Sequence, residues 1–389
     1  VYKRQPLESL DLYTEKSGDE IVGQLYNFVD KGDRPVSLRP EMTPSLARIL
    51  AERSRALPKP IRWFSTPQLF RYERQQRGRL REHFQWNVDI VGEEGTGADV
   101  DVLAVAIDGL RELGLNQEDF RARVSDRRLL GKVLGATGVP EDRMAATFAV
   151  VDKVERESRD RILDRLVQEV GLPDGVATAL LSMLEAPGLE TVRDRFGDRD
   201  DVGQQIAVLD AYMADMEALG MGGFVEFDLT IVRGLAYYTG IVFELFDRKG
   251  ELRAICGGGR YDRLLELVGG EPLPAVGFGM GDVVLGELLK QRNLTSEYRR
   301  SVDYFVVPVT PGERAMALRV AAGLRAKGHS ALYPLKPQSV RRQLKSAGSE
   351  GARWVVVLGP DEVGRGEAVL RDMESGSEEV VSLDTLLDS

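Results

Sequence analysis

An arginine, Arg233, stands directly before a stretch of sequence that has the pattern of a half-buried strand. The segment from Thr230 to Leu245 reads TIVRGLAYYTGIVFEL. From Tyr237 onward its residues alternate between two faces, one with Tyr237, Thr239, Ile241, Phe243 and Leu245, the other with Tyr238, Gly240, Val242 and Glu244. A guanidinium group beside apolar strand residues is costly to bury unless an anion compensates its charge. The pattern therefore predicts an anionic ligand close to Arg233.

A second group of polar residues lies on an expected hairpin, RWFSTPQLFRYERQQRGRLREHFQWNVDIVG, in which a polar loop, Arg74–Arg79, joins two strands. On the return strand His83, Gln85, Asn87 and Asp89 share one face, opposite Phe84, Trp86, Val88 and Ile90. The outgoing strand is expected to place Arg71 and Glu73 on a single face. If the two polar faces coincide, the sheet presents arginine and carboxylate groups together, which suits a ligand with both anionic and cationic groups. A half-exposed antiparallel strand without a function has the same alternation.

Two further segments are open to two interpretations each. The loop RQQRGR, which ends at Arg79, is either a solvated hairpin tip or a basic loop that reaches phosphates. The segment CGGGRYDRL places three glycines before Arg260 and Tyr261, where they permit either close approach of a ligand or a structural bulge. A third segment, RPEMTPSL, predicts a turn through Glu41 and a helix that Thr43 caps, with Pro44 at its first position.

Several common kinds of site are absent from the sequence. AVGFGMGDVVLGELL has Asp282 where a dinucleotide fingerprint needs its third glycine, and there is no GxxxxGK[ST], GxSxG or HExxH motif. A single cysteine, Cys256, excludes an internal disulfide and favours a reducing, cytoplasmic setting. With only two histidines, a zinc site is not expected. The net charge of −10 argues against nonspecific coating of nucleic acid but is compatible with a local basic track.

The elements that must position these residues fall into several regions. The 389 residues are too many for one ordinary core, and no run approaches the ~20 apolar residues of a membrane helix. Residues 1–122 and 223–298 mix strands with helices, whereas 123–222 is helical in pattern and shows no chemistry. Residues 303–389 alternate strand and helix, which indicates a small α/β domain with a mainly parallel sheet. No Met opens the chain, and VYKRQPLESLDLYTEKSGDE begins as if within a domain, so we expect an N-terminally incomplete chain.

Taken together, LRPEMT, FRYERQQRGRLREHFQ, VRGLAYYTGIVFE and GGGRYDRL, followed by the C-terminal α/β unit, resemble the histidyl-tRNA synthetases, a family of class II aminoacyl-tRNA synthetases. The resemblance runs from about Leu7 to the end of the chain. It implies an α+β fold: an antiparallel-sheet catalytic domain (1–122 and 223–298), a helical insertion (123–222) that contacts tRNA, and an α/β anticodon-binding domain (303–389). It also implies a homodimer and a ligase that activates histidine with ATP and Mg²⁺, then transfers it to tRNA(His).

The resemblance also implies roles for individual residues. Arg71 and Arg233 would be catalytic and act at the α-phosphate of ATP, while Glu73 and Arg79 would complete the ATP site. Histidine would be bound by Glu41, Thr43, Gln85, Asp89, Arg233, Tyr238 and Tyr261. Of these, Glu41, Thr43 and Asp89 would meet its amino group, Gln85 its carboxylate, and the two tyrosines its imidazole. No protein cluster is expected to hold a metal ion, and Mg²⁺ would arrive with ATP.

The chain departs from the family pattern in two readable places. Val284 stands where the third motif usually has an arginine that stacks on adenine and reaches the γ-phosphate, and Ala236 replaces an aspartate. The alternative to a synthetase is the paralogue that senses histidine and regulates ATP phosphoribosyltransferase. The missing arginine favours that regulator, whereas the complete VRGLAYYTGIVFE segment and residues 303–389 favour the synthetase. A synthetase for another amino acid would leave the histidine-specific segment without a purpose.

Overall fold

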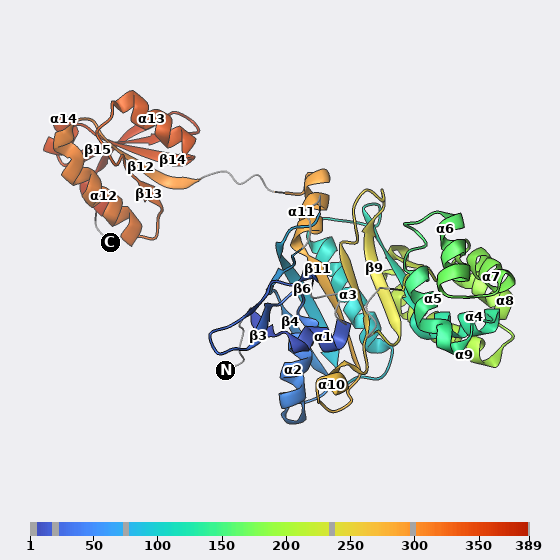
Figure 1. Ribbon diagram of the computed structural model, residues 1–389. Helices are drawn as coiled ribbons and strands as arrows, with labels where there is room; N and C mark the ends of the chain where they lie inside the picture. Colours follow the sequence, from blue (N-terminus) through green and yellow to red (C-terminus); the bar gives the residue numbers. More distant parts are fainter. Residues whose placement is uncertain (1–5, 18–22, 73–77, 233–237, 296–300, 388–389) are drawn as a thin grey trace. The chain divides into compact units, whose positions relative to one another are not determined.

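The computed structural model describes residues 6–17, 23–72, 78–232, 238–295 and 301–387 (Figure 1). Two compact units account for the chain, one that ends at Thr295 and one that begins at Ser296. The division of the first unit at residues 122 and 222, predicted from sequence, stays a prediction. The predicted sites at Glu73 and Arg233 lie outside the described residues.

The first unit is built around an eight-stranded sheet. In spatial order its strands are β4 (Ile61–Ser65), β6 (Glu82–Val91), β11 (Ala275–Gly281), β10 (Cys256–Arg260), β9 (Ile241–Asp247), β7 (Phe120–Asp126) and β8 (Val225–Phe227), with β5 (Gln68–Phe70) paired to β6. Every neighbouring pair is antiparallel except β7 with β8. The expected antiparallel sheet is therefore confirmed.

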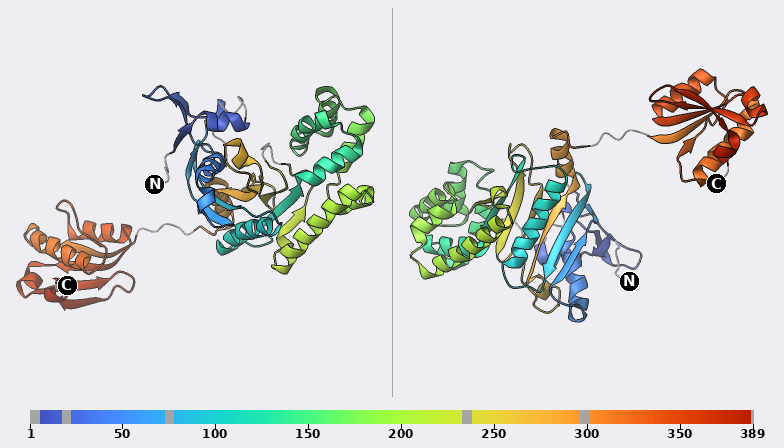
Figure 2. Two further views of the ribbon diagram at one scale, coloured as in Figure 1. Left: turned by 90° about the horizontal axis from the view of Figure 1, so that it is seen from below. Right: turned by 180° about the vertical axis from the view of Figure 1, so that it is seen from behind.

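Helices cover both faces of this sheet (Figure 2). On one face lies α3 (Gly97–Glu112), where the Trp86 ring packs so closely on Gly109 that a Cβ there would lie 2.6 Å from it. On the other face α2 (Thr43–Arg53) and α10 (Leu264–Leu267) pack over Val242 in a second core. Strand β9 is buried along the face of Ile241, Phe243 and Leu245. On its other face Val242 is buried, whereas Glu244 and Phe246 are only partly buried and line a cleft. The expected difference between the two faces is therefore present at Glu244 and Phe246, and at Val242 it is lost because α2 and α10 pack there.

Two local predictions near the hairpin are also wrong. The outgoing strand is not continuous: β4 ends at Ser65, and β5 begins at Gln68 after a break that contains Pro67. A proline has no N–H for the ladder, which explains the interruption. Thr43 does not cap α2, because it is the first helical residue and the N-cap position is taken by Met42 without a side-chain cap.

Between β7 and β8 the chain is helical, as the sequence pattern predicts. The helices are α4 (Arg127–Thr137), α5 (Met144–Val151), α6 (Arg159–Asp164), α7 (Asp174–Leu184), α8 (Leu189–Phe196) and α9 (Asp200–Ala218). The Asp126 carboxylate caps α4 by accepting hydrogen bonds from the amides of Arg128 and Leu129, and Gly138 ends that helix in the left-handed conformation. The helices thus start directly at the end of a sheet strand.

The remaining elements of the first unit are short. A separate three-stranded sheet has the order β1 (Leu7–Ser9), β3 (Pro35–Leu38) and β2 (Asn27–Val29). Helix α1 (Asp11–Ser17) follows β1, and α11 (Asp282–Gln291) follows β11.

The second unit holds a five-stranded sheet of mixed direction. Its strands in order are β13 (Ala331–Leu332), β12 (Val302–Pro308), β14 (Ala352–Leu358), β15 (Glu367–Asp372) and β16 (Glu378–Ser382), and its helices are α12 (Arg314–Ala326), α13 (Val340–Ser349), α14 (Pro360–Gly364) and α15 (Leu383–Leu387). Strands β13, β12 and β14 are parallel, but β15 and β16 run antiparallel. The mainly parallel sheet predicted from sequence is thus wrong for these last strands, because the turn between them is too short for a parallel crossover.

Candidate active site

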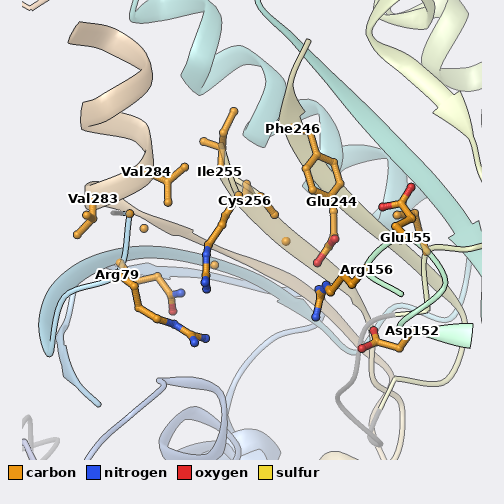
Figure 3. Close-up of a pocket in the computed structure, with 18 of the residues that line it drawn as sticks. Arg79, Asp152, Glu155, Arg156, Glu244, Phe246, Ile255, Cys256, Val283 and Val284 are labelled. Atoms are coloured by element: carbon orange, nitrogen blue, oxygen red, sulfur yellow. The ribbon is translucent and has the colours of Figure 1, made fainter. Parts of the chain in front are cut away.

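A cleft of about 760 Å³ opens on the face of the large sheet that also carries α2 (Figure 3). Its floor is a patch of glycines on neighbouring strands. Gly279 of β11 pairs with Gly257 of β10, and one step along the strands Gly277 pairs with Gly259. Directly opposed residues of an antiparallel pair point to the same face, so these four positions add no side chains of their own to that face, and Gly257 and Gly279 line the cleft directly. A ligand can therefore approach the backbone closely.

The same glycines make room for polar side chains from β6. A Cβ on Gly279 would lie 2.7 Å from Cδ of Gln85, and a Cβ on Gly277 would overlap Oδ1 of Asp89. Strand β10 is regular, with continuous pairing to β9 and β11. Of the two interpretations of CGGGRYDRL, the bulge is wrong. Close approach of neighbouring groups is what these glycines allow.

Asp89 is a buried carboxyl group on β6 opposite Gly277, and, like Tyr238 and Tyr261, it is not among the described residues that line the cleft. Its side chain accepts a hydrogen bond from the Tyr261 hydroxyl, and both residues are almost fully buried. Burial raises the pKa of Asp89 to about 7, although the Tyr261 hydrogen bond acts in the opposite direction. Burial, and then the Asp89 charge, raises the pKa of Tyr261 well above its ordinary value. Asp89 is thus poised to ionise when a cation enters.

Tyr261 is held by a network below the floor. The preceding residue, Arg260, is 4% exposed and forms a buried ion pair with Asp99 of α3. The same guanidinium donates to the carbonyl oxygens of Glu93 and Gly95, at 3.0 and 2.8 Å. Tyr238 belongs to the same apolar core as Tyr261. The network therefore fixes the end of β10 from which Tyr261 reaches Asp89.

Arg71 and Gln85, which lie on the two polar faces that the sequence allows to coincide, both line the cleft. Arg71 follows directly after β5, where its amide donates to the carbonyl of Arg81 at 2.8 Å and its Nε donates to the carbonyl of Pro40 at 3.2 Å. Arg79 lines the cleft on the same loop, beside Gly78. The hairpin thus directs two guanidinium groups toward the glycine floor.

Glu41 and Thr43 occupy the turn and the first residue of α2, directly after the carbonyl that Arg71 contacts. Neither Glu41 nor Thr43 is among the described residues that line the cleft. Val232, which precedes Arg233, does line the cleft, and its carbonyl accepts a hydrogen bond of 2.8 Å from Arg127.

The helical stretch supplies one wall of the cleft, which the sequence pattern did not predict. Asp152, Glu155 and Arg156 follow α5 and line the cleft at the end away from Arg79 (Figure 3). Arg123 of β7 donates to Glu155 and to Asp228, and so ties this wall to the sheet. Polar residues in a short segment between helices have no hydrophobic periodicity that would distinguish a site from an ordinary loop, because most such segments are simply solvated.

A further missed wall comes from the segments on either side of the strands β10 and β11. Arg253 and Ile255 precede β10, and Val283 and Val284 begin α11; all four line the cleft. The position that departs from the family pattern, Val284, lies beside the hairpin loop, since a Cβ on Gly78 would lie 3.4 Å from its Cγ2. The sequence signals for this wall are an arginine three residues before a glycine-rich strand and the departure from the family pattern at Val284.

Carboxylates in the cleft are dispersed. In the described part of the chain, no group of three or more histidine, cysteine, aspartate or glutamate side chains is arranged to hold a metal ion. Asp152, Glu155 and Glu244 nevertheless line the cleft, and such carboxylates suit Mg²⁺ that is already bound to phosphates. A search of the described helices for a span long and apolar enough to cross a membrane finds none.

Comparison with known proteins places these features in a family. A family model described as histidyl-tRNA synthetase matches residues 5–281, and one described as an anticodon binding domain matches residues 303–389. The chain is 41% identical over 379 residues to the histidine–tRNA ligase of Opitutus terrae, which covers 97% of this chain and 87% of that protein. It is 40% identical over 380 residues to the chloroplastic/mitochondrial histidine–tRNA ligase of Arabidopsis thaliana, with 98% and 77% covered.

A solved structure has the same fold. The crystal structure of histidyl-tRNA synthetase from Nostoc sp. PCC 7120 superposes with a TM-score of 0.77 at 22% identity. The match covers 98% of this chain and 89% of that one. The architecture expected from the sequence, a sheet-based domain with helices inserted and a second α/β domain, is thereby confirmed.

Proposed function

The chain belongs to the histidyl-tRNA synthetase family, and from that premise we propose that its cleft activates histidine with ATP before transfer to tRNA(His). The activity is that of an aminoacyl-tRNA synthetase, a ligase. One observation carries the assignment to this cleft. The glycine floor has two guanidinium groups, those of Arg71 and Arg79, on the hairpin side, and the neighbouring strand β6 carries a buried carboxyl group, Asp89, whose pKa is raised to about 7. An amino acid and a nucleotide phosphate need that combination of charges.

The first step joins the two substrates. A carboxylate oxygen of histidine attacks the α-phosphorus of ATP, the bond to the bridging oxygen breaks, and pyrophosphate leaves with that electron pair. Charge grows on the nonbridging oxygens, where Arg71 would stabilise it. Arg233 would contribute a second guanidinium group; it lies outside the described residues and follows Val232, a cleft residue. In the second step a terminal ribose hydroxyl of tRNA attacks the acyl carbon, and AMP leaves.

The remaining predicted residues would orient the substrates. Asp89 would take the histidine ammonium group once ionised, with Glu41 and Thr43 assisting from the start of α2. Gln85 would meet the histidine carboxylate, and Tyr238 and Tyr261 would surround the imidazole. Glu73 and Arg79 of the hairpin would contact ATP. Mg²⁺, when bound with ATP, would neutralise charge on the phosphates. Glu244, a carboxylate that lines the cleft, would be a suitable oxygen ligand for it.

Partners beyond the small substrates follow from the same premise. The second unit would bind the anticodon arm of tRNA, with Arg341, Arg342 and Lys345 of α13 as candidates for phosphate contacts. A homodimer is supported by large apolar side chains exposed on the first unit, among them Phe64 at 76% and Val29 at 66%. The buried thiol of Cys256, the single cysteine, is compatible with a cytoplasmic location.

The regulatory paralogue is the less favoured alternative. Residues 303–389 match the anticodon-binding model, and the curated relatives at about 40% identity are ligases. The two functions differ in one measurable activity. A synthetase exchanges pyrophosphate into ATP when histidine is present, and a histidine sensor does not.

The test is therefore histidine-dependent ATP–pyrophosphate exchange, followed by charging of tRNA(His) transcripts. We expect exchange that needs histidine and is not supported by other amino acids, and charging that needs tRNA(His). Histidine binding without exchange would support the regulator and contradict the proposal. Exchange with a different amino acid would contradict the specificity.

A further inference from the structure

Arg253 is a cation of the cleft wall to which the family pattern assigns no role. It lies in the connection between β9 and β10 and is exposed. Ala254, Ile255 and Cys256, the three residues that follow it, line the cleft as Arg253 itself does. The segment thus runs along the cleft rather than out into solvent.

The backbone around Arg253 is fixed on both sides. Before it, the amide of Leu252 donates to the buried carboxylate of Asp247 at 3.1 Å. After it, the amide of Ile255 donates to the carbonyl of Leu245 at 2.7 Å, so the chain has already rejoined the sheet. An arginine held within two residues of anchored backbone on each side loses less freedom when it binds a ligand than one on a loose loop.

The cleft wall beside the Arg253 segment offers apolar side chains. Cys256 pairs with Met280 at the end of the β10–β11 ladder, so the segment before Cys256 runs beside the start of α11. There the cleft-lining side chains are those of Val283 and Val284, with Arg79 beyond them on the hairpin (Figure 3). A phosphate chain that extends from Arg71 along this wall would need another cation to offset its charge.

The other cleft charges are less suited to that task. Arg156 lies on the insertion wall together with Asp152 and Glu155, and Glu244 also faces the cleft (Figure 3). Where no Mg²⁺ lies between them, these carboxylates repel a polyanion at that end, although the charge of Glu155 is partly offset by its ion pair with Arg123. Arg253 and Arg79 are the cleft arginines on the side where α11 begins.

We propose that Arg253 binds the β- and γ-phosphates of ATP, and so supplies a phosphate contact on the wall where Val284 offers none. The inference rests on the proposed function of the cleft as an ATP site. It names a residue from the β9–β10 connection as the polyphosphate-binding group and leaves the adenosine and α-phosphate to other residues.

The test compares Arg253→Ala with wild type in direct binding of a nonhydrolysable ATP analogue and of AMP, measured by calorimetry without histidine. We expect at least about a tenfold weaker affinity for the ATP analogue, the usual loss for one charge-assisted hydrogen bond, and AMP affinity within twofold of wild type. Lys249→Ala is the matched control, since Lys249 is a cation of the same connection that does not line the cleft. Its affinity for the analogue should equal that of wild type.

Three results would overturn the inference. Unchanged affinity of Arg253→Ala for the ATP analogue would remove Arg253 from the site. An equal loss for AMP and for the analogue would place its action on the adenosine or α-phosphate. An equal loss of affinity for the ATP analogue in Lys249→Ala would show that any positive charge in this connection has the same effect, without a specific contact from Arg253. Because binding is measured without histidine, a failure of histidine activation in the wild-type protein would appear separately, in the exchange assay.

Discussion

Asp89 shows how one residue acquires a property from its surroundings. The carboxyl group stands on a strand whose sequence alternates regularly, yet it is buried and accepts a hydrogen bond from the Tyr261 hydroxyl. With a pKa near 7 rather than the ordinary 3.8, about half of these groups are protonated at neutral pH. Binding of a cationic ammonium group favours the ionised form. Ligand binding and proton release should therefore be linked.

The first prediction concerns the pH dependence of histidine binding. Affinity of the wild-type protein should rise as pH increases from 6 to 8, because Asp89 ionises across that window. Asp89→Asn should bind more weakly and should lose this part of the profile. Calorimetric titration of both proteins between pH 5.5 and 8.5 separates the effect from the titration of histidine itself, which is common to both. Parallel profiles for the two proteins would contradict the assignment.

The same pKa has a consequence for stability with a definite sign. The folded-state pKa of Asp89 lies above its unfolded value, so the folded state holds the proton more tightly between about pH 4 and 7. The contribution of this group to the free energy of unfolding is therefore largest below pH 4, and it is lost as pH rises through 7. In Asp89→Asn the free energy of unfolding should no longer show this decrease between pH 4 and 7.

The second prediction concerns Arg71, which combines a cleft position with a backbone anchor at Pro40. Arg71→Ala should lower the rate of histidine-dependent exchange by about 10²–10³-fold, the usual loss for one group that stabilises transition-state charge. Histidine affinity should change much less. Arg71→Lys should recover only part of the rate, because a lysine cannot form the two parallel hydrogen bonds of a guanidinium. Single-turnover adenylate formation is the measurement, and a near wild-type rate in Arg71→Ala would exclude this role.

At the scale of elements, strand β11 has a glycine at every second position from Gly277 to Gly281, so one face of the strand carries no side chains there. Gly277, Gly279 and Gly281 fall on the cleft face, opposite the positions of Asp89, Asn87 and Gln85 on β6. The alternation removes side chains from one face and keeps Val276, Phe278 and Met280 on the other, where they belong to the main core. A strand of this kind supports a core and a ligand floor at once.

The third prediction uses two of these glycines. Gly279→Ala places a methyl group 2.7 Å from the Gln85 side chain, so Gln85 must move and catalytic efficiency for histidine should fall about tenfold or more. The melting temperature should change little, since a flexible side chain can yield. Gly281→Ala is the control on the same strand and face, because its methyl group would meet no heavy atom within 4 Å. Steady-state exchange kinetics measure both; equal effects of the two changes would contradict a specific role for the space over Gly279.

The helices between β7 and β8 show what an element can add without a sequence signature. Their apolar periodicity predicts a packed helical body, and the structure has one. The short segment after α5 is polar and without period, yet it forms a cleft wall through its link from Glu155 to Arg123. The stretch interpreted from sequence as free of chemistry thus borders the candidate site.

At the scale of the whole molecule, apolar side chains remain exposed along one edge of the large sheet. Phe64 on β4 and Phe84 on β6 are 76% and 52% exposed, and strands β4 and β6 are neighbours. Large apolar groups at a sheet edge are unfavourable in water and typical of a surface that another chain covers. This edge is where we expect the partner subunit of a homodimer.

The fourth prediction is that this protein forms a homodimer through that edge. Phe64→Asp should shift the monomer–dimer equilibrium toward monomer by at least about tenfold in dissociation constant, because the change places a charge in an apolar contact. Sedimentation velocity over a concentration series is the measurement. Val380→Asp is the control, because Val380 is also exposed, at 61%, but belongs to the second unit. A wild-type chain that stays monomeric at all concentrations, or equal effects of the two changes, would contradict the prediction.

The sequence by itself determined the class of each element and the family. Alternating strands and helical periodicity depend on near neighbours in the chain, and these were sufficient to predict the helical stretch and the second α/β unit. The antiparallel sheet was predicted from the resemblance to the family that the ordered motifs carry. Motif order and spacing were sufficient for the family, which the comparisons confirm. The roles of Glu73 and Arg233 stay predictions, since these residues lie outside the described part of the chain.

Only the tertiary structure decided which distant residues share the cleft. Arg71, Glu155, Arg253 and Val284 come from four separate segments, and no local pattern relates them. Strand pairing set the antiparallel direction of β15 and β16, and the packing of α2 and α10 buried Val242 on the cleft face of β9. The pKa of Asp89 likewise depends on burial by segments far along the chain. Strand pairing, burial and electrostatic environment depend on contacts between segments. A sequence pattern predicts them only where the contacting residues are close together in the chain.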